Sequence, residues 1–383
     1  MSNIPKLRFP EFKGEWEEKK LSDIASFSKG KGYTKNDLVK NGTPIVLYGR
    51  MYTKYETVIS DIDTFVNLQA GSIISKGGEI IVPASGETAE EISRASVVKN
   101  KGIILGGDLN ILSLQKNNFN PEFFALTISN GKPQKRLSKL AQGKSVVHLH
   151  NEDLRGLQIN VPSLAEQKKI ADFLSNVDSI IAAETKILNA LQKKKKTLMQ
   201  KLFTQQLRFK SADGTDFPAW EEKKLGECVI SISSGKNKQK DSAGNYPVYG
   251  SMGIIGYSEQ YVYNKDCILV ARVGANAGTL HIAKGKYDVS DNTLIIELNE
   301  NELLSFYYYL LVNINLNKLN YGTGQPLVTS GMLKNINIQI PCKAEQQKIA
   351  DCLSSIDSLI QTQQKVVTTW QQRKKALLQQ MFI

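Results

Sequence analysis

The sequence has few cysteines and no long apolar run. Only four of the 383 residues are cysteine, all in the second half and without paired spacing: Cys228, Cys267, Cys342 and Cys352. This usage argues against a disulfide framework and favours reduced thiols in a cytosolic protein. No apolar run approaches the roughly eighteen residues of a membrane span, and the polar N-terminus lacks a signal-peptide pattern. We therefore expect a cytoplasmic protein without a membrane segment.

Acidic residues are outnumbered. The 37 Asp and Glu residues face 49 Lys and Arg, which gives a formal net charge of +12 and a pI near 9.3. A basic balance permits binding to a polyanion but does not establish it. The length allows two or three domains with ample core, and the 41% hydrophobic content is ordinary for a globular protein.

Histidine is scarce, and no set of residues has the spacing of a metal or nucleotide site. His148 and His150 are too close for a helical metal pair, and His281 stands alone. Gly143-Lys144-Ser145 resembles the end of a phosphate-binding loop, but Ser138 stands where that loop requires its first glycine. We expect neither a metal nor a nucleotide on this chain.

A methyltransferase signature is incomplete. Asn120-Pro121-Glu122-Phe123 is one letter from the N-P-P-F motif of amino-methyltransferases, but the second proline is missing. No F-x-G-x-G partner for S-adenosylmethionine is present either. We therefore interpret the stretch as structural and expect the chain not to be an enzyme.

The sequence contains a long segment twice. AEQKKIADFLSNVDSII at Ala165–Ile181 returns as AEQQKIADCLSSIDSLI at Ala344–Ile360, an offset of 344 − 165 = 179. WEEKKL at Trp16–Leu21 returns letter for letter at Trp220–Leu225, an offset of 220 − 16 = 204. The regions between these landmarks differ, so we expect two copies of one scaffold with diverged loops.

The repeated segments have the periodicity of helices that pair with each other. Each helix of roughly 40 residues would be about 60 Å long, and a lone helix with one apolar stripe is not stable at that length. Lys195 and Lys374 are matched polar positions in the stripe, which can fix the register, as are Glu184 and Gln363. The apolar positions, in steps of three and four, are Ile170, Leu174, Val177, Ile181, Leu188 and Leu191 in the first copy and Ile349, Leu353, Ile356, Ile360, Val367 and Trp370 in the second.

The order of the segments predicts the architecture. A mixed domain at 1–158 leads into the helix of 159–206, and a second mixed domain at 207–337 leads into the helix of 338–383. The second helix must then run back, so the pair is antiparallel and holds the domains apart. Joining Ile383 to Met1 would complete a pseudo-twofold, circular pattern. The predicted fold class is α+β.

Local signals predict individual elements. Thr43–Tyr48 and Gly78–Pro83 are strand-like runs bounded by Gly and Pro, and Pro121–Leu126 is typical of a short helix with proline in its first turn. Ser163–Glu166 is a capping-box pattern, in which the Ser oxygen and the Glu carboxylate each accept from a free backbone N–H. The second copy has Cys342 in place of the serine, so we expect a weaker cap there.

The repeated text resembles the specificity subunit of type I restriction–modification systems over essentially the whole chain. The matching stretches are 161–181, 340–360, the two WEEKKL segments and the loops that precede each helix. The resemblance implies two target-recognition domains that each read one half of an asymmetric, bipartite DNA site. It also implies helices that set the spacer and dock two adenine-methyltransferase subunits, with restriction/translocase subunits in a larger complex.

The resemblance further implies that S-adenosylmethionine, ATP and Mg²⁺ belong to the partner subunits, and that this chain binds double-stranded DNA without catalysing a reaction. Two alternatives remain. The chain could be a coiled-coil scaffold with protein-binding domains, or a specificity module for a single-chain restriction–methylation enzyme.

Candidate DNA contacts lie in loops at equivalent places of the two halves. Arg and Asn can reach base edges, whereas Lys beside Gly and Ser suits phosphate. Each residue alone is compatible with solvated surface, but the equivalent positions together favour binding. The candidates are Lys29, Lys31, Tyr48, Arg50, Ser85, Thr88, Arg94, Lys144 and His148 in the first half and Lys236, Lys238, Tyr249, Ser251, Arg272, Asn276 and Gln325 in the second.

Overall fold

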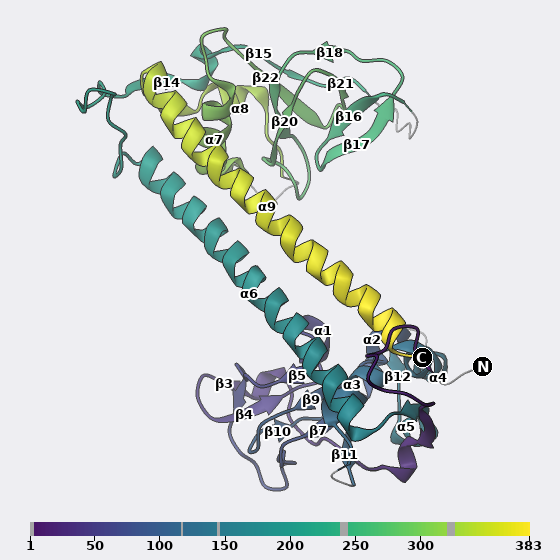
Figure 1. The fold of residues 1–383 in the computed structure, drawn as a ribbon. Coiled ribbons are helices and arrows are strands. Elements are labelled where there is room, and N and C mark those ends of the chain that lie inside the picture. The colour runs from purple at the N-terminus through teal and green to yellow at the C-terminus, as the bar shows by residue number, and fades with distance from the viewer. Residues whose placement is uncertain (1–3, 116–117, 144–145, 238–243, 320–325) are drawn as a thin grey trace. The chain divides into compact units, whose positions relative to one another are not determined.

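The chain forms two compact units. Unit 1 comprises Met1–Glu184 and Val366–Ile383, and unit 2 comprises Thr185–Lys365. Each unit holds one mixed α/β domain and a stretch of both long helices, α6 (Leu164–Phe203) and α9 (Lys343–Met381) (Figure 1). The computed structural model describes residues 4–115, 118–143, 146–237, 244–319 and 326–383.

Unit 1 is built on a five-stranded sheet buried on both faces. Ile80 and Val82 face one hydrophobic core while Ile81, between them, faces another, as the period of two in a strand requires. A sheet covered on both sides explains why this strand is a continuous apolar run. In order across the sheet, the strands are β2 (Ala25–Lys29), β11 (Leu109–Leu114), β7 (Glu79–Pro83), β9 (Ser96–Val98) and β5 (Val58–Ile59).

The rest of unit 1 consists of a second sheet, two ribbons and short helices. The second sheet has the order β10 (Ile104–Leu105), β4 (Thr43–Val46), β6 (Phe65–Val66) and β3 (Leu38–Val39). The ribbons are β1 (Glu17–Lys20) with β13 (Gln158–Val161), and β12 (Val147–His148) with β8 (Ser85–Gly86). The short helices are α1 (Arg50–Thr53), α2 (Ala89–Ile92), α3 (Pro121–Ile128), α4 (Gly131–Leu140) and α5 (Asn151–Arg155).

Unit 2 repeats this plan. Ile268 and Val270 face one core and Leu269 faces the other. The central sheet has the order β15 (Val229–Ser234), β22 (Thr293–Leu298), β19 (Cys267–Ala271) and β20 (Leu280–Ala283). The second sheet has the order β17 (Gly253–Ser258), β16 (Tyr246–Gly250), β21 (Lys286–Val289) and β18 (Tyr263–Asn264). A ribbon of β14 (Glu221–Lys224) with β23 (Asn337–Ile340) and the helices α7 (Leu304–Ile314) and α8 (Ser330–Lys334) complete it.

The helix predicted at Pro121 is confirmed. The Asn120 side chain accepts a hydrogen bond from the Phe123 backbone N–H at 2.9 Å, and Pro121 occupies the first turn, where no N–H is needed. The stretch that resembles a methyltransferase motif is therefore a helix start. Within the described residues, no helix is long and apolar enough to cross a membrane.

The long helices pair antiparallel in both units. In unit 1 the Lys374 ammonium lies 2.5 Å from the Asp178 carboxylate, and in unit 2 Lys195 lies 2.6 Å from Asp357. The repeat relates the two pairs, because 374 − 195 and 357 − 178 both equal 179. The matched lysines of the stripe thus form matched ion pairs, and the α+β class with two mixed domains and two antiparallel helices is confirmed.

The apolar stripe packs on the domains as well as between the helices. All twelve predicted stripe residues are buried or half-buried. Ile170 and Leu174 lie in the core of unit 1 beside Phe382, and Ile349 and Leu353 lie in the core of unit 2. The start of each long helix is therefore part of the domain that precedes it.

The expected capping box forms only in part. The Glu166 backbone N–H donates to the Ser163 hydroxyl at 3.4 Å, but the Glu166 carboxylate does not return to the helix end. It is almost fully buried and accepts from Arg8 at 2.7 and 2.8 Å and from the Trp16 indole at 3.3 Å. The half-buried Arg8 guanidinium outcompetes a backbone N–H for this carboxylate, because its bond is charge-assisted and bidentate.

Unit 2 contains the same cluster. Glu345 is buried and accepts from Arg208 at 3.1 and 2.7 Å and from the Trp220 indole at 3.0 Å. The repeated Leu-Arg-Phe, Trp-Glu and Ala-Glu-Gln texts thus meet in space in both units. We name these two groups the Arg–Glu–Trp clusters.

The segments near the two ends of the chain meet in unit 1. The Leu7 N–H donates to the Gln380 carbonyl at 3.0 Å, and in unit 2 the Leu207 N–H donates to the Lys201 carbonyl at 3.1 Å. Lys201 and Gln380 are related by the same offset of 179. In unit 2 this hydrogen bond joins residues six apart in the sequence, whereas in unit 1 it joins the N-terminal segment to the C-terminal one. The circular pattern predicts this difference.

Candidate nucleic-acid interface

The candidate loops follow strands that leave the central sheet at one edge. In unit 1, β2 and β7 both run antiparallel to β11, which lies between them, so their C-terminal ends share an edge. In unit 2, β15 and β19 have the same relation to β22. Loops that are distant in sequence are therefore brought together in both units by strand direction alone.

A third segment joins each edge. In unit 1 His148 pairs with Ser85 in the ribbon of β12 and β8, and in unit 2 Leu327 bridges Val273. Leu327 and His148 differ by the offset 327 − 148 = 179. We name residues 28–32, 84–88 and 146–151 the loop edge of unit 1, and residues 234–237, 272–278 and 326–329 the loop edge of unit 2.

Two buried asparagines fasten the loop edge of unit 1. The Asn110 amide donates to the Leu149 carbonyl at 2.9 Å, and the Asn151 amide donates to the Ser28 carbonyl at 3.1 Å. Sequence reasoning missed both residues. The available signal was an asparagine inside the otherwise apolar strand at 109–112, a position where an amide needs a partner.

The loop edge of unit 2 is fastened differently. Leu294 occupies the register position of Asn110, and Ser330 lies at the offset of 179 from Asn151. Here the Arg272 guanidinium donates to the Ser234 hydroxyl at 3.4 Å and so links the loops after β19 and β15. The backbones are equivalent while the side chains that fasten them are not.

Lys29, Lys31 and His148 lie exposed at the loop edge of unit 1. Between the two lysines, Gly30 packs so tightly that an added Cβ would lie 1.8 Å from the Gly106 carbonyl oxygen. Only glycine fits there, and the close approach fixes the backbone that carries both ammonium groups. Their exposure leaves them accessible, and their contact with phosphates or base edges stays a prediction.

Tyr48 extends this surface. The residue is 39% exposed, and its ring meets the Tyr52 ring edge to face at 6.3 Å between centroids. The Tyr52 hydroxyl donates to the Ser85 carbonyl at 2.5 Å, and burial raises the pKa of Tyr52 above its usual value. Helix α1 is thereby tied to the loop edge, and Tyr48 lies exposed in the turn that precedes it.

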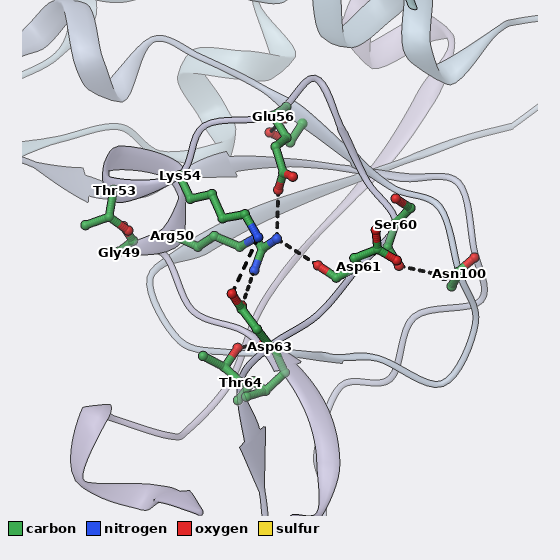
Figure 2. Close-up of polar contacts among 12 residues, drawn as sticks. Gly49, Arg50, Thr53, Lys54, Glu56, Ser60, Asp61, Asp63, Thr64 and Asn100 are labelled. Carbon is green, nitrogen blue, oxygen red and sulfur yellow. Dashed lines mark hydrogen bonds and ion pairs between the residues drawn. The ribbon is translucent and has the colours of Figure 1, made fainter. Parts of the chain in front are cut away.

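Arg50 does not fit the predicted DNA contact. Its side chain is buried, and it donates to the Asp63 carboxylate, the Glu56 carboxylate and the Asp61 carbonyl at 2.7, 2.7 and 2.8 Å (Figure 2). Lys54 also reaches Asp63, at 3.4 Å. The guanidinium is neutralised inside the domain, so it would have to break these bonds to reach a base. We correct its role to structural.

Thr88 and Arg94 are also engaged within unit 1. Thr88 caps α2, its hydroxyl oxygen accepting from the Glu91 N–H at 3.2 Å. The half-buried Arg94 lies over the Tyr55 ring, 5.1 Å from its centroid, and donates to the Met51 carbonyl at 3.4 Å. Both contacts hold the loop in shape, and neither uses a carboxylate.

In unit 2, Lys236 and Asn276 are exposed at the loop edge. Tyr249 is half-buried and packs edge to face on Tyr287 at 5.6 Å, so most of its ring belongs to the core. Ser251, in the turn between β16 and β17, is half-exposed. The remaining candidates, Lys144, Lys238 and Gln325, lie outside the described residues.

The turn of unit 2 presents a residue that sequence reasoning missed. Met252 is 76% exposed at the tip of the β16–β17 hairpin, where unit 1 has helix α1 after the matching Tyr-Gly pair.

Among the described residues, no group of three or more His, Cys, Asp or Glu side chains could hold a metal ion. The two loop edges therefore offer different sets of cations, amides and hydroxyls on equivalent backbones.

Comparison with known proteins identifies the same two halves. A protein-family profile described as Type I restriction modification DNA specificity domain matches residues 13–193 and 219–369. The specificity subunit of the type I restriction enzyme MjaVIII from Methanocaldococcus jannaschii is 27% identical and aligns over 97% of this chain and 92% of its own length. The specificity subunit of EcoprrI from Escherichia coli is 25% identical over 51% of this chain and 50% of its own length.

Solved structures share the fold. The crystal structure of the S subunit of a type I restriction–modification system from M. genitalium matches with a TM-score of 0.67 at 17% identity, over 99% of both chains. A structure from work on complex assembly and conformational transition of the type I R-M system matches with a TM-score of 0.58 at 17% identity, over 95% of this chain and 96% of that one.

Proposed function

Because the chain belongs to the type I restriction modification DNA specificity family, we propose that it is the non-catalytic DNA-recognition subunit of such a system. The observation that carries the proposal is that each family match falls on a unit with its own loop edge. Lys29 and Lys31 lie exposed at the loop edge of unit 1 and Lys236 at that of unit 2, beside polar groups, as phosphate positioning and base readout require.

The target is a bipartite, asymmetric DNA site. Equivalent backbones at the two loop edges would meet DNA in the same way, but Asn110 and Asn151 in unit 1 have unlike counterparts in unit 2, Leu294 and Ser330. Different side chains on equivalent supports read different bases. The two half-sites therefore differ in sequence, and residues 1–158 and 207–337 are the respective target-recognition domains.

The helices, 159–206 and 338–383, are the dock for partners. Two copies of one helical text give two equivalent seats, which suits two adenine-methyltransferase subunits in the cytoplasm, with restriction/translocase subunits joining them. S-adenosylmethionine, ATP and Mg²⁺ are then requirements of the partners. Adding four residues after Gln192 should change the unread spacer and leave the bases read unchanged.

Sequencing methylated adenines in a host that carries this chain with its modification subunit tests the proposal. We expect one split motif with two unlike halves and a fixed gap, absent when the chain is deleted. A continuous palindrome would refute the two-domain account. Binding of the purified chain to DNA should weaken steeply with salt, and salt-independent or absent binding would favour a protein-binding scaffold.

A further inference from the structure

Among the described arginines, Arg272 combines partial burial with the absence of a carboxylate or ring partner; Arg136 also lacks both, but it is exposed. Arg8, Arg50 and Arg208 each bind carboxylates. Arg94, Arg155 and Arg373 lie over aromatic rings, and Arg136 donates to the Gln158 side chain at 2.9 Å. Within the described chain, Arg272 has neither a carboxylate nor a ring, only the 3.4 Å bond to Ser234.

The position of Arg272 is fixed at both backbone groups. Its N–H donates to the Asn292 carbonyl at 2.9 Å, and its carbonyl accepts from the Val328 N–H at 2.8 Å. The side chain is half-buried, and its Nε atom is buried without a hydrogen-bond partner in the described structure. A partly desolvated cation without an anion costs free energy. A planar acceptor that enters the loop edge would recover it.

The feature belongs to unit 2 alone. In unit 1 the same backbone position is Ala84, whose N–H donates to Asp108 and whose carbonyl accepts from Leu149, at 2.8 and 3.0 Å. The backbone hydrogen bonds of Ala84 match those of Arg272 one for one. The two units therefore share the backbone at this position and differ in the side chain. A side chain that differs while its support is shared is placed to distinguish the half-sites.

Resting on the proposed function, we propose that Arg272 reads a guanine in the half-site of unit 2. Guanine presents two acceptors, O6 and N7, side by side in the major groove, and the guanidinium fork donates to both at once. A phosphate would take the same fork. The half-buried, backbone-fixed setting favours a base edge, whereas the exposed Lys236, two residues after Ser234, suits phosphate.

The test compares wild type, Arg272→Ala and Arg272→Lys in the full chain assembled with its modification subunit. Competition binding is measured on the mapped site with each base pair replaced in turn. We expect discrimination at one guanine, in one half-site only, to fall roughly 5- to 150-fold in both variants. Lysine keeps the charge but lacks the fork. Unchanged discrimination in the other half-site shows that the complex is folded.

Arg136→Ala is the matched control, since Arg136 lies on α4 and bonds the side chain of a β13 residue. It should leave every position unchanged. Equal weakening at all positions by Arg272→Ala, with recovery by Arg272→Lys, would show a phosphate contact and overturn the proposal, as would unaltered discrimination. A wild-type complex that binds all sequences alike would refute the proposed function itself, and the guanine contact with it.

Discussion

At the loop edge of unit 1 two asparagine amides hold three chain segments together, whereas at the loop edge of unit 2 one arginine links two of them. The backbone hydrogen bonds beneath are the same in both units: Ala84 and Arg272 make matching pairs. The comparison separates what the duplicated fold needs from what each copy can vary. Backbone pairing keeps the loops in place, so the side chains above are free to change.

The junctions between domain and helix show the opposite behaviour. Both Arg–Glu–Trp clusters keep the same three residue types, and both Lys–Asp pairs between the helices keep theirs. A buried carboxylate tolerates little change, because removal of its partner leaves an uncompensated charge. Divergence is therefore concentrated at the loop edges and excluded from the junctions.

The largest effect should come from Glu166→Ala. It leaves Arg8, whose side chain is 13% exposed, without its carboxylate, and breaking a buried pair costs about 3–5 kcal/mol. Glu345→Ala should cost less, because the Arg208 side chain is 26% exposed. Urea unfolding followed by circular dichroism measures both losses.

The exposed pair of Lys169 and Glu11 in unit 1 is the control, and Glu11→Ala should change the stability little. Equal losses for Glu166→Ala and Glu345→Ala would contradict the ranking by exposure.

Arg50→Ala should come next, with a loss of about 2 kcal/mol from its charge-assisted hydrogen bonds. Burial acts to raise the pKa of Asp63, but the backbone hydrogen bond and the Arg50 guanidinium outweigh it and hold that pKa below the usual value. A carboxylate whose pKa is lower in the folded state stabilises the fold at pH values above its unfolded pKa of about 3.9. This contribution is lost as the pH falls through the folded-state pKa. The gap between wild type and Arg50→Ala, measured by urea titration, should therefore narrow in acid.

The base preference of the Arg50→Ala complex separates a structural role from DNA contact. Discrimination at both half-sites should stay as in wild type. A selective loss at one base would restore Arg50 as a DNA contact.

Asn110→Leu gives unit 1 the residue that unit 2 has at this register position. It removes the donor to the Leu149 carbonyl and should cost about 1 kcal/mol. Amide hydrogen exchange should quicken in 147–151 and stay unchanged in 326–330 of unit 2. Unaltered protection of 147–151 would show that the backbone bonds alone fasten this segment.

The smallest expected loss of stability comes from the two Lys–Asp ion pairs between the long helices, and it should differ between them. Asp357 accepts from Lys195 and also from the Tyr309 hydroxyl at 2.8 Å, whereas Asp178 has the ion pair with Lys374 and no such hydroxyl donor among the described residues. Asp357→Asn should therefore cost about 1 kcal/mol and Asp178→Asn about 0.5 kcal/mol. Double-mutant cycles with Lys195→Met and Lys374→Met measure the two couplings. A larger coupling for Asp178 would reverse the comparison.

Much of the fold was predictable because its signals are local or duplicated. The three-and-four spacing predicts the long helices and the repeat predicts their equivalence. The matched polar positions predict a fixed register, and the structure shows that their lysines form ion pairs. The helix at Pro121 follows from the proline in its first turn, and the strands at Thr43 and Gly78 follow from the Gly and Pro residues that bound them. Strand-and-loop order also placed candidate loops at equivalent positions of the two units.

The partners of individual side chains could not be predicted in this way. Glu166 has the spacing of a capping box, but its carboxylate binds Arg8, 158 residues away, and Arg50 has the chemistry of a DNA contact but faces Asp63 and Glu56. The local sequence shows which side chains are charged. It does not show which oppositely charged side chain the fold brings within hydrogen-bonding distance.

The sequence by itself determined the duplication, the antiparallel helices and the family. Helical periodicity, repeated text and the order of segments can all be found in the sequence without knowing which distant residues touch. Only the tertiary structure decided that β2 and β7 release their loops at one edge, that Asn110 and Asn151 fasten them, and that Arg272 has no carboxylate partner among the described residues. These facts depend on strand direction and on contacts between distant segments, where packing and desolvation choose the partner of each polar group.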